Sequence, residues 1–258
     1  MNHNLCKNCD YTFEGNFCSN CGQKSTVVEL KMYDLFHEFW HSVTHTDKGI
    51  LKLIKDLFLH PKQVYLGYFS GRRKTYFSPV TFFLIAATLL ILIGEKIYDY
   101  EDYVHRFTSP NGYNEFGRYA FAATKLNTLI TLPFTILLTW LFFRKQFNLA
   151  KNIVFWLYFH GLMFTLQIII SPLCFAFIFY KELIDTIFVF VSYVFLFWHL
   201  LTVFSRKKLI DYVIVFFIVN FFHIVNNLIT AYNLFGEEVF KFTKTKNIFK
   251  LILYFYGL

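Results

Sequence analysis

The chain has 258 residues, 56% of them hydrophobic and 22% aromatic, with a mean hydropathy of +0.43. Soluble globular domains are close to half apolar, so this composition excludes an ordinary soluble protein and favours a membrane protein. The net charge of +8 would fit nucleic-acid binding in a soluble domain, but in a membrane protein it is typical of basic cytoplasmic loops, and we expect no nucleic-acid partner.

Residues 1–28 carry four of the five cysteines, Cys6, Cys9, Cys18 and Cys21, in the pattern C-x2-C-x8-C-x2-C. Two adjacent thiolate pairs suit tetrahedral zinc, because each pair can occupy one edge of the ion. A site closed by four cysteines leaves no open position for chemistry. We therefore predict a structural zinc ribbon; the alternatives are two disulfides or an eroded site without metal.

Residues around the cysteines support this prediction. Gly22 follows Cys21, where a knuckle needs a positive φ. No apolar signal segment is found in residues 1–30, so the ribbon is expected to stay cytoplasmic. The fifth cysteine, Cys174, lies in apolar surroundings and is expected to be a buried, inert thiol. Four apolar side chains are expected to cover the metal: Leu5, Tyr11, Phe13 and Phe17.

Residues 29–76 are predicted to form amphipathic helices at the membrane surface. Lys52, Lys55 and Asp56 fall opposite an apolar helical stripe. Such a helix could lie on the anionic cytoplasmic leaflet or, equally, pack against a transmembrane bundle. A second short helix is expected from Pro61 to a cap at Gly71. The stripe consists of Ile50, Leu51, Leu53, Ile54, Leu57 and Phe58.

Three basic residues, Arg72, Arg73 and Lys74, come just before the first apolar span. A phospholipid headgroup is their natural counter-charge, and ordinary anchoring at the cytoplasmic face explains them about as well.

The stretch HEFWH, from His37 through Glu38 to His41, matches the zinc-protease pattern H-E-x-x-H. On a helix the two histidines would share one face for zinc, and the glutamate could activate water. No third ligand follows at a recognisable spacing. A zinc metallohydrolase is therefore the least favoured interpretation, and a surface helix is the alternative.

Five apolar segments are each close to the ~20 residues that a helix needs to cross the membrane. The resulting fold class is an all-α integral membrane protein with a bundle over residues 77–229. The third segment continues past Pro172, where we expect a kink. In the tail, 230–258, a final apolar stretch is too short to span and is expected to be re-entrant or interfacial. The spans are 77–93, 126–143, 153–170, 183–204 and 209–229.

Lys and Arg outside these spans set the predicted orientation. Residues 1–76 carry ten, whereas the loop 94–125 carries four against five acidic residues. Further basic residues follow the second and fourth spans. The positive-inside rule therefore places the N-terminus in the cytoplasm and the chain in the cytoplasmic (inner) membrane. Five spans then place the tail outside, where its four lysines fit less well.

Ionisable side chains inside spans are functional candidates, because each needs a partner there. The candidates here are His160, Asp185, His199 and His223. His160 and His199 fall at similar depth and could face each other, and Asp185 could reach His223. Such contacts would indicate a transporter or channel for protons or a small solute; hydrogen bonds between packed helices are the alternative.

The stretches CKNCDYTFEGNFCSNCGQK and DKGILKLIKDLFLHPKQVYLGYFSGRRKTYFSPVTFFL resemble the bacterial membrane family catalogued as domain of unknown function 3667. That family, found largely in Bacteroidetes, has a cysteine ribbon and a signature before its first span. The resemblance is specific over residues 6–85 and implies architecture and location but no activity. Six signature residues match in order: Pro61, Tyr68, Gly71, Arg73, Tyr76 and Pro79.

The sequence thus predicts a multi-pass membrane protein of unknown molecular activity, in which no catalytic residues are identified. Structural zinc is the expected cofactor. The ribbon is expected to be a binding or assembly module for a cytoplasmic protein or for another copy of the chain, and the bundle to contact anionic lipid headgroups.

Overall fold

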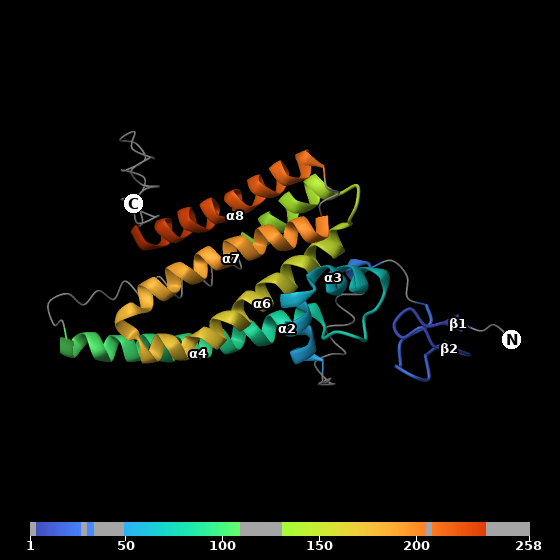
Figure 1. Ribbon diagram of the computed structural model, residues 1–258, viewed down its shortest axis with the longest axis horizontal. Coiled ribbons are helices and arrows are strands. Elements are labelled where there is room, and N and C mark those ends of the chain that lie inside the picture. The colour runs from blue at the N-terminus through green and yellow to red at the C-terminus, as the bar shows by residue number, and fades with distance from the viewer. Residues whose placement is uncertain (1–3, 27–29, 34–48, 109–130, 205–207, 236–258) are drawn as a thin grey trace.

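The computed structural model describes residues 4–26, 30–33, 49–108, 131–204 and 208–235. His37, Glu38 and His41, the start of the predicted second span and most of the predicted tail lie outside these ranges. Within them the chain is mostly helical, as predicted, with a small ribbon at one end of an elongated helical bundle (Figure 1).

The ribbon holds two short antiparallel strands, β1 (Asn4–Leu5) and β2 (Thr12–Phe13). Asn4 pairs with Phe13, and Leu5 pairs with Thr12. Farther along, an isolated antiparallel bridge joins Phe17 to Lys24. The two bridged regions place the two cysteine pairs opposite each other.

Two ten-residue helices, α2 (Ile50–Leu59) and α3 (Pro61–Ser70), follow the undescribed segment. They are separated at His60, because the residue before a proline is disfavoured in the α-helical region, and His60 has φ −136° and ψ 52°. Pro61 fits the first helical position, where its missing N–H is not needed. Gly71 ends α3 with φ 109°, which confirms the predicted glycine cap.

The long helices are α4 (Pro79–Thr108), α6 (Leu149–Ala176), α7 (Lys181–Phe204) and α8 (Leu209–Phe235). A further apolar helix runs over Thr131–Phe143, and a short 3-10 turn, η1 (Ile178–Tyr180), joins α6 to α7. The helices extend beyond several predicted spans: α4 continues through charged residues after 93, and α6 contains Pro172 and continues to Ala176. Apolar periodicity marks the membrane-compatible part of a helix, not its ends.

Residue pairs between helices give their directions. Phe83 contacts Phe164, and the hydroxyl of Tyr158 donates to the carbonyl of Phe77, so α4 and α6 run in parallel. Phe155 contacts Phe204, and Phe159 contacts His199, so α6 and α7 are antiparallel. The starts of α4, α6 and α8 and the end of α7 therefore lie together at the end of the bundle nearest the ribbon, here called the ribbon end (Figure 1).

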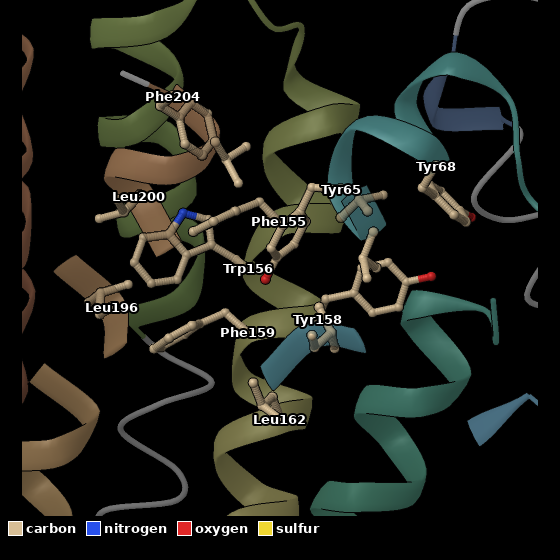
Figure 2. Close-up of a cluster of buried hydrophobic side chains, with 14 of the residues drawn as sticks. Tyr65, Tyr68, Phe155, Trp156, Tyr158, Phe159, Leu162, Leu196, Leu200 and Phe204 are labelled. Carbon is tan, nitrogen blue, oxygen red and sulfur yellow. The ribbon is translucent and has the colours of Figure 1, made fainter. Parts of the chain in front are cut away.

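An aromatic core fills this end of the bundle (Figure 2). Trp156 on α6 is fully buried and donates from Nε1 to the hydroxyl of Thr139. The helices α2 and α3 contribute to the same core rather than standing apart from it. The fully buried side chains that they supply are Leu53, Leu57, Val64, Tyr65 and Tyr68.

The apolar stripe predicted for α2 is therefore only partly the buried face. Leu53 and Leu57 lie in the core, with Ile50 and Ile54 packed beside them. Leu51 is exposed to 76%, and Phe58 is also exposed although its ring contacts Phe195 on α7. The apolar stripe of α2 is therefore wider than the part of α2 that packs against α6 and α7. Whether α2 and α3 also rest on a membrane surface stays a prediction.

Among the described residues, two helices are long and apolar enough to cross a membrane, Leu149–Ala176 and Leu183–Phe204. Three shorter apolar helices, Pro79–Gly94, Thr131–Phe143 and Leu209–Val225, lie beside them. Exposed apolar side chains occur along α4, α7 and α8. These findings support a membrane location, and the count of five spans stays a prediction.

Candidate metal centre and its contacts with the bundle

The four N-terminal cysteines converge on one point. Their sulfur atoms all lie within 4.8 Å of one another. Cys6 and Cys21 are separated by 3.5 Å between sulfurs, and Cys9 and Cys18 by 3.7 Å. Four sulfurs at ~2.3 Å from a tetrahedral zinc ion are about 3.8 Å apart, whereas a disulfide bond is ~2.05 Å long. The quartet has the dimensions of a metal site, and the disulfide alternative is wrong for these cysteines.

The two cysteine pairs lie in matching turns. The N–H of Cys6 donates to the carbonyl of Tyr11 at 2.9 Å, and the N–H of Asp10 donates back to Cys6 at 3.0 Å. The second turn repeats this pattern twelve residues later: Cys18 donates to Gln23, and Gly22 donates to Cys18, both at 2.8 Å.

Each turn needs a positive φ directly after its second cysteine. Gly22 has φ 70°, which confirms the prediction for that position. Asp10 has φ 57° at the equivalent place after Cys9, and the sequence reasoning missed it. Asp and Asn tolerate this conformation better than most residues do. The sequence could have predicted this conformation, because Asp10 follows Cys9 just as Gly22 follows Cys21.

Little apolar cover surrounds the cysteines. Phe13 is exposed to only 5% and packs on the cysteine cluster, as predicted. The same prediction is wrong for Leu5, Tyr11 and Phe17, which are exposed to 67%, 50% and 61%. One buried ring cannot offset the ordering of some twenty residues, so a bound metal would have to supply most of the folding free energy of the ribbon.

The thiols also favour a cation. A hydrogen bond from the backbone of Tyr11 lowers the pKa of Cys9 to about 7. Burial raises the pKa of Cys21 to about 12. The four sulfurs lie so close together that their thiolate forms would repel one another, and a bound cation would offset this repulsion. Cysteine thiolates together with tetrahedral spacing fit zinc.

The first knuckle is bound to the loop between α3 and α4 through Asn8. Its Oδ1 accepts hydrogen bonds from the N–H of Lys74 at 3.2 Å, the N–H of Thr75 at 3.0 Å and the hydroxyl of Thr75 at 2.9 Å. Asn8 stands between Cys6 and Cys9. The conformation that collects the sulfurs also aims this side chain at the loop.

The second knuckle binds the same loop through Gln23. This side chain is buried, and its Nε2 donates to the carbonyl of Gly71 at 2.8 Å. Between the two contacts, Arg72 lies 3.7 Å from the carboxylate of Asp10. Both charged side chains are more than half exposed, so this ion pair adds little stability. The hydrogen bonds of Asn8 and Gln23 carry the docking.

The chain after the ribbon is anchored to the bundle as well. Leu30 is fully buried in the helical core. Its carbonyl accepts a hydrogen bond from Nδ2 of Asn148 at 2.9 Å. Asn148 also caps α6, because its Oδ1 accepts from the N–H of Lys151. Ribbon, loop and bundle are thus joined at several separate points.

The predicted intramembrane residues lie on three different helices. His199 on α7 is buried, with its Nδ1 3.2 Å from the hydroxyl of Tyr65. His223 on α8 stacks against Tyr193. Asp185 is half-buried near the start of α7. His160 on α6 is buried among the rings of Trp156, Phe159, Phe164 and Phe222.

The three histidines are linked through shared aromatic neighbours. The rings of His160 and His199 both contact the ring of Phe159. His223 contacts the rings of Tyr193 and Phe222, and the ring of Phe222 also contacts His160. The contacts of these histidines are thus largely aromatic, which is typical of packed helix interfaces.

Residues of the signature shared with the resembled family have local structural roles. Gly71 takes the left-handed conformation that ends α3, and Tyr68 is fully buried against Tyr158. The hydroxyl of Tyr76 donates to Asp56 at 3.2 Å, and burial raises the pKa of Tyr76 to about 12. Pro61 and Pro79 each begin a helix. Five of the six signature residues therefore shape α3 and its junction with α4.

A family model matches residues 47–91, which include α2, α3, the loop bound by the ribbon and the first part of α4. No curated protein and no solved structure matches the chain. Over residues 47–91 the chain resembles the family described as "Protein of unknown function (DUF3667)".

Proposed function

We propose that the protein is a multi-pass protein of the cytoplasmic membrane whose zinc ribbon is an assembly module acting first on its own chain. The observation that carries this proposal is the docking of both knuckles on the loop 71–75. The ribbon fixes the segment that enters the first membrane helix, and zinc makes the ribbon rigid enough to do so.

The charge distribution supports a cytoplasmic location for the ribbon end. The starts of α4, α6 and α8 meet there, together with the end of α7. The basic residues in the described turns and first helical turns at this end are Arg72, Arg73, Lys74, Arg144, Lys145, Lys151 and Lys208. Such a concentration at one end of the bundle is what the positive-inside rule predicts.

Helix length supports a position for α2 and α3 at the membrane surface. With 28 residues, α6 is roughly 42 Å long at ~1.5 Å per residue. The hydrocarbon core is ~30 Å thick, so about 12 Å of α6 projects beyond it. The residues that α2 and α3 cover belong to the first turns of α6, where Tyr65 contacts Phe155 and Tyr68 contacts Tyr158.

Removal of the docking side chains tests the assembly role without touching the metal ligands. In Asn8→Ala/Gln23→Ala we expect trypsin to cleave after Arg72, Arg73 or Lys74 at least ~10-fold faster than in the wild type, in protein reconstituted into lipid nanodiscs. Asn8 and Gln23 together make four hydrogen bonds to the loop, each worth about 0.5–1.5 kcal/mol net, and 1.4 kcal/mol is a factor of ten in an equilibrium. Zinc content should stay at one ion per chain.

The matched control is Ser70→Ala, which removes an exposed hydroxyl that bonds only within α3. It should leave the cleavage rate unchanged. Equal cleavage rates in the docking variant and the wild type would show that the ribbon does not hold the loop, and the assembly role would be wrong.

Binding of a further cytoplasmic protein, or of a second copy of the chain, by the exposed side of the ribbon stays a prediction. Leu5, Tyr11 and Phe17 are available there. Tyrosine and phenylalanine are enriched at protein interfaces, which is what makes this side of the ribbon a candidate.

Transport is the second candidate function, and one observation favours it. Nε2 of His160 and Nε2 of His199 are buried and have no hydrogen-bond partner among the described residues. Buried unpaired polar atoms call for a water molecule or a functional role. If the protein conducts protons, flux into reconstituted vesicles should exceed that of empty vesicles and fall in His160→Ala/His199→Ala. Equal flux in protein-containing and empty vesicles would remove this candidate.

A further inference from the structure

We propose that the docked ribbon and the loop together form a binding site for the phosphate of an anionic phospholipid headgroup. The site would consist of Lys7 from the first knuckle and of Arg72 and Lys74 from the loop. This inference deepens the proposed function and depends on it, because the ribbon must be docked for the site to exist.

The hydrogen bonds of the Asn8 side chain and the ion pair between Arg72 and Asp10 place the three basic residues where the first knuckle meets the loop. Asn8 accepts hydrogen bonds from the N–H groups of Lys74 and Thr75, and Lys7 precedes Asn8 directly in the chain. Lys7, Arg72 and Lys74 are all exposed. The two knuckles fix the loop from both sides, so its basic side chains extend from a rigid backbone.

One carboxylate already occupies part of this seam. Asp10 lies 3.7 Å from the guanidinium of Arg72, and both side chains are largely exposed to solvent. Carboxylates and phosphates are recognised by arginine in similar ways. Asp10 therefore marks a position where an anion can reach Arg72, and a phosphate would compete with it.

Depth favours a lipid over a soluble phosphate. The helix α4 begins at Pro79, and its apolar residues follow at once. Arg72 and Lys74 therefore precede the first span by only a few residues, where headgroups are expected. Tyr76, between loop and helix, is the kind of aromatic residue that accumulates at this level.

The test is the affinity of the purified full-length chain for short-chain phosphatidylglycerol, measured by native mass spectrometry in detergent. We expect Arg72→Gln/Lys74→Gln to weaken binding ~10-fold or more, because each basic side chain near a charged membrane surface contributes ~1 kcal/mol. The matched control, Arg144→Gln/Lys145→Gln, removes the same charge from another exposed turn at the same end. It should change the affinity less than twofold.

A variant that is expected to tighten lipid binding provides a second test. Asp10→Asn should tighten binding, because it removes the carboxylate that competes for Arg72. Asn also tolerates the positive φ of this position, so the knuckle is preserved. Asn8→Ala should weaken binding with zinc still at one ion per chain.

Equal losses in the two double variants would show non-specific charge attraction and overturn the proposal. So would unchanged binding in Arg72→Gln/Lys74→Gln, or equal binding of phosphatidylcholine. Competition by inorganic phosphate at the same concentration would assign the site to a soluble anion and overturn the lipid assignment. Zinc content and the tryptic protection of the wild-type loop are measured separately, so the assembly role can stand if the lipid site fails.

Discussion

The variant Cys18→Ser/Cys21→Ser should contain no zinc by elemental analysis, whereas the wild-type chain should contain one ion. Structural zinc contributes ~10–16 kcal/mol to the folding of small zinc modules at neutral pH, which far exceeds what the single buried ring of Phe13 can supply. The ribbon should therefore unfold in this variant, and Asn8 and Gln23 should leave the loop. Cleavage by trypsin after residues 72–74 should then be at least as fast as in the docking variant.

The fifth cysteine provides the control for this prediction. Cys174 is buried in α6, outside the cysteine quartet. Cys174→Ser should therefore keep one zinc ion and the slow cleavage of the wild type. Full zinc content in Cys18→Ser/Cys21→Ser would show that the quartet is not the metal site.

The same elemental analysis decides the metallohydrolase hypothesis. His37→Ala/His41→Ala should keep the single zinc ion of the wild type. Two ions in the wild type, one of them lost with the histidines, would make a metallohydrolase the leading function.

The second large effect is expected at Gly161 on α6, which packs against the ring of Phe82 on α4. A Cβ atom at this position would lie 2.5 Å from Cδ1 of Phe82, whose side chain is almost fully buried and has little room to move. Small residues at helix contacts in membranes allow this kind of close approach. Gly161→Val should lower the free energy of unfolding by roughly 3 kcal/mol, measured by denaturation in mixed detergent micelles.

Gly67 in α3 is the matched control for this position. A Cβ atom there would meet only Cδ of Arg72, at an ordinary 3.9 Å. Gly67→Ala should therefore keep or slightly raise stability, by about 0.5–1 kcal/mol, because alanine favours helix more than glycine does. Equal stability of Gly161→Val and the wild type would show that α4 and α6 do not pack as described.

Features with local causes were predictable from the sequence. The cysteine spacing predicted the quartet, and backbone sterics predicted the conformations of Gly22 and Gly71. Pro61 predicted the start of α3. In each case the deciding interaction lies within a few residues, so the sequence around it contains the needed information.

Features that depend on distant contacts were not predictable. Asn8 and Gln23 are ordinary knuckle residues, and their roles depend on a loop some fifty or more residues away. Tyr65 meets His199 across 134 residues. The buried width of the α2 stripe depends on the shape of α6 and α7, and periodicity alone cannot supply that shape.

The most direct test of the central claim is hydrogen exchange at the amides of Lys74 and Thr75 in membrane-reconstituted protein, with and without a zinc chelator. In the zinc-loaded protein these amides should exchange slowly, because both donate to Asn8. Chelation should speed their exchange at least ~10-fold while the amides in the centre of α6 stay protected. Exchange of Lys74 and Thr75 at the same rate in both states would contradict the account, since the metal would then have no hold on the loop.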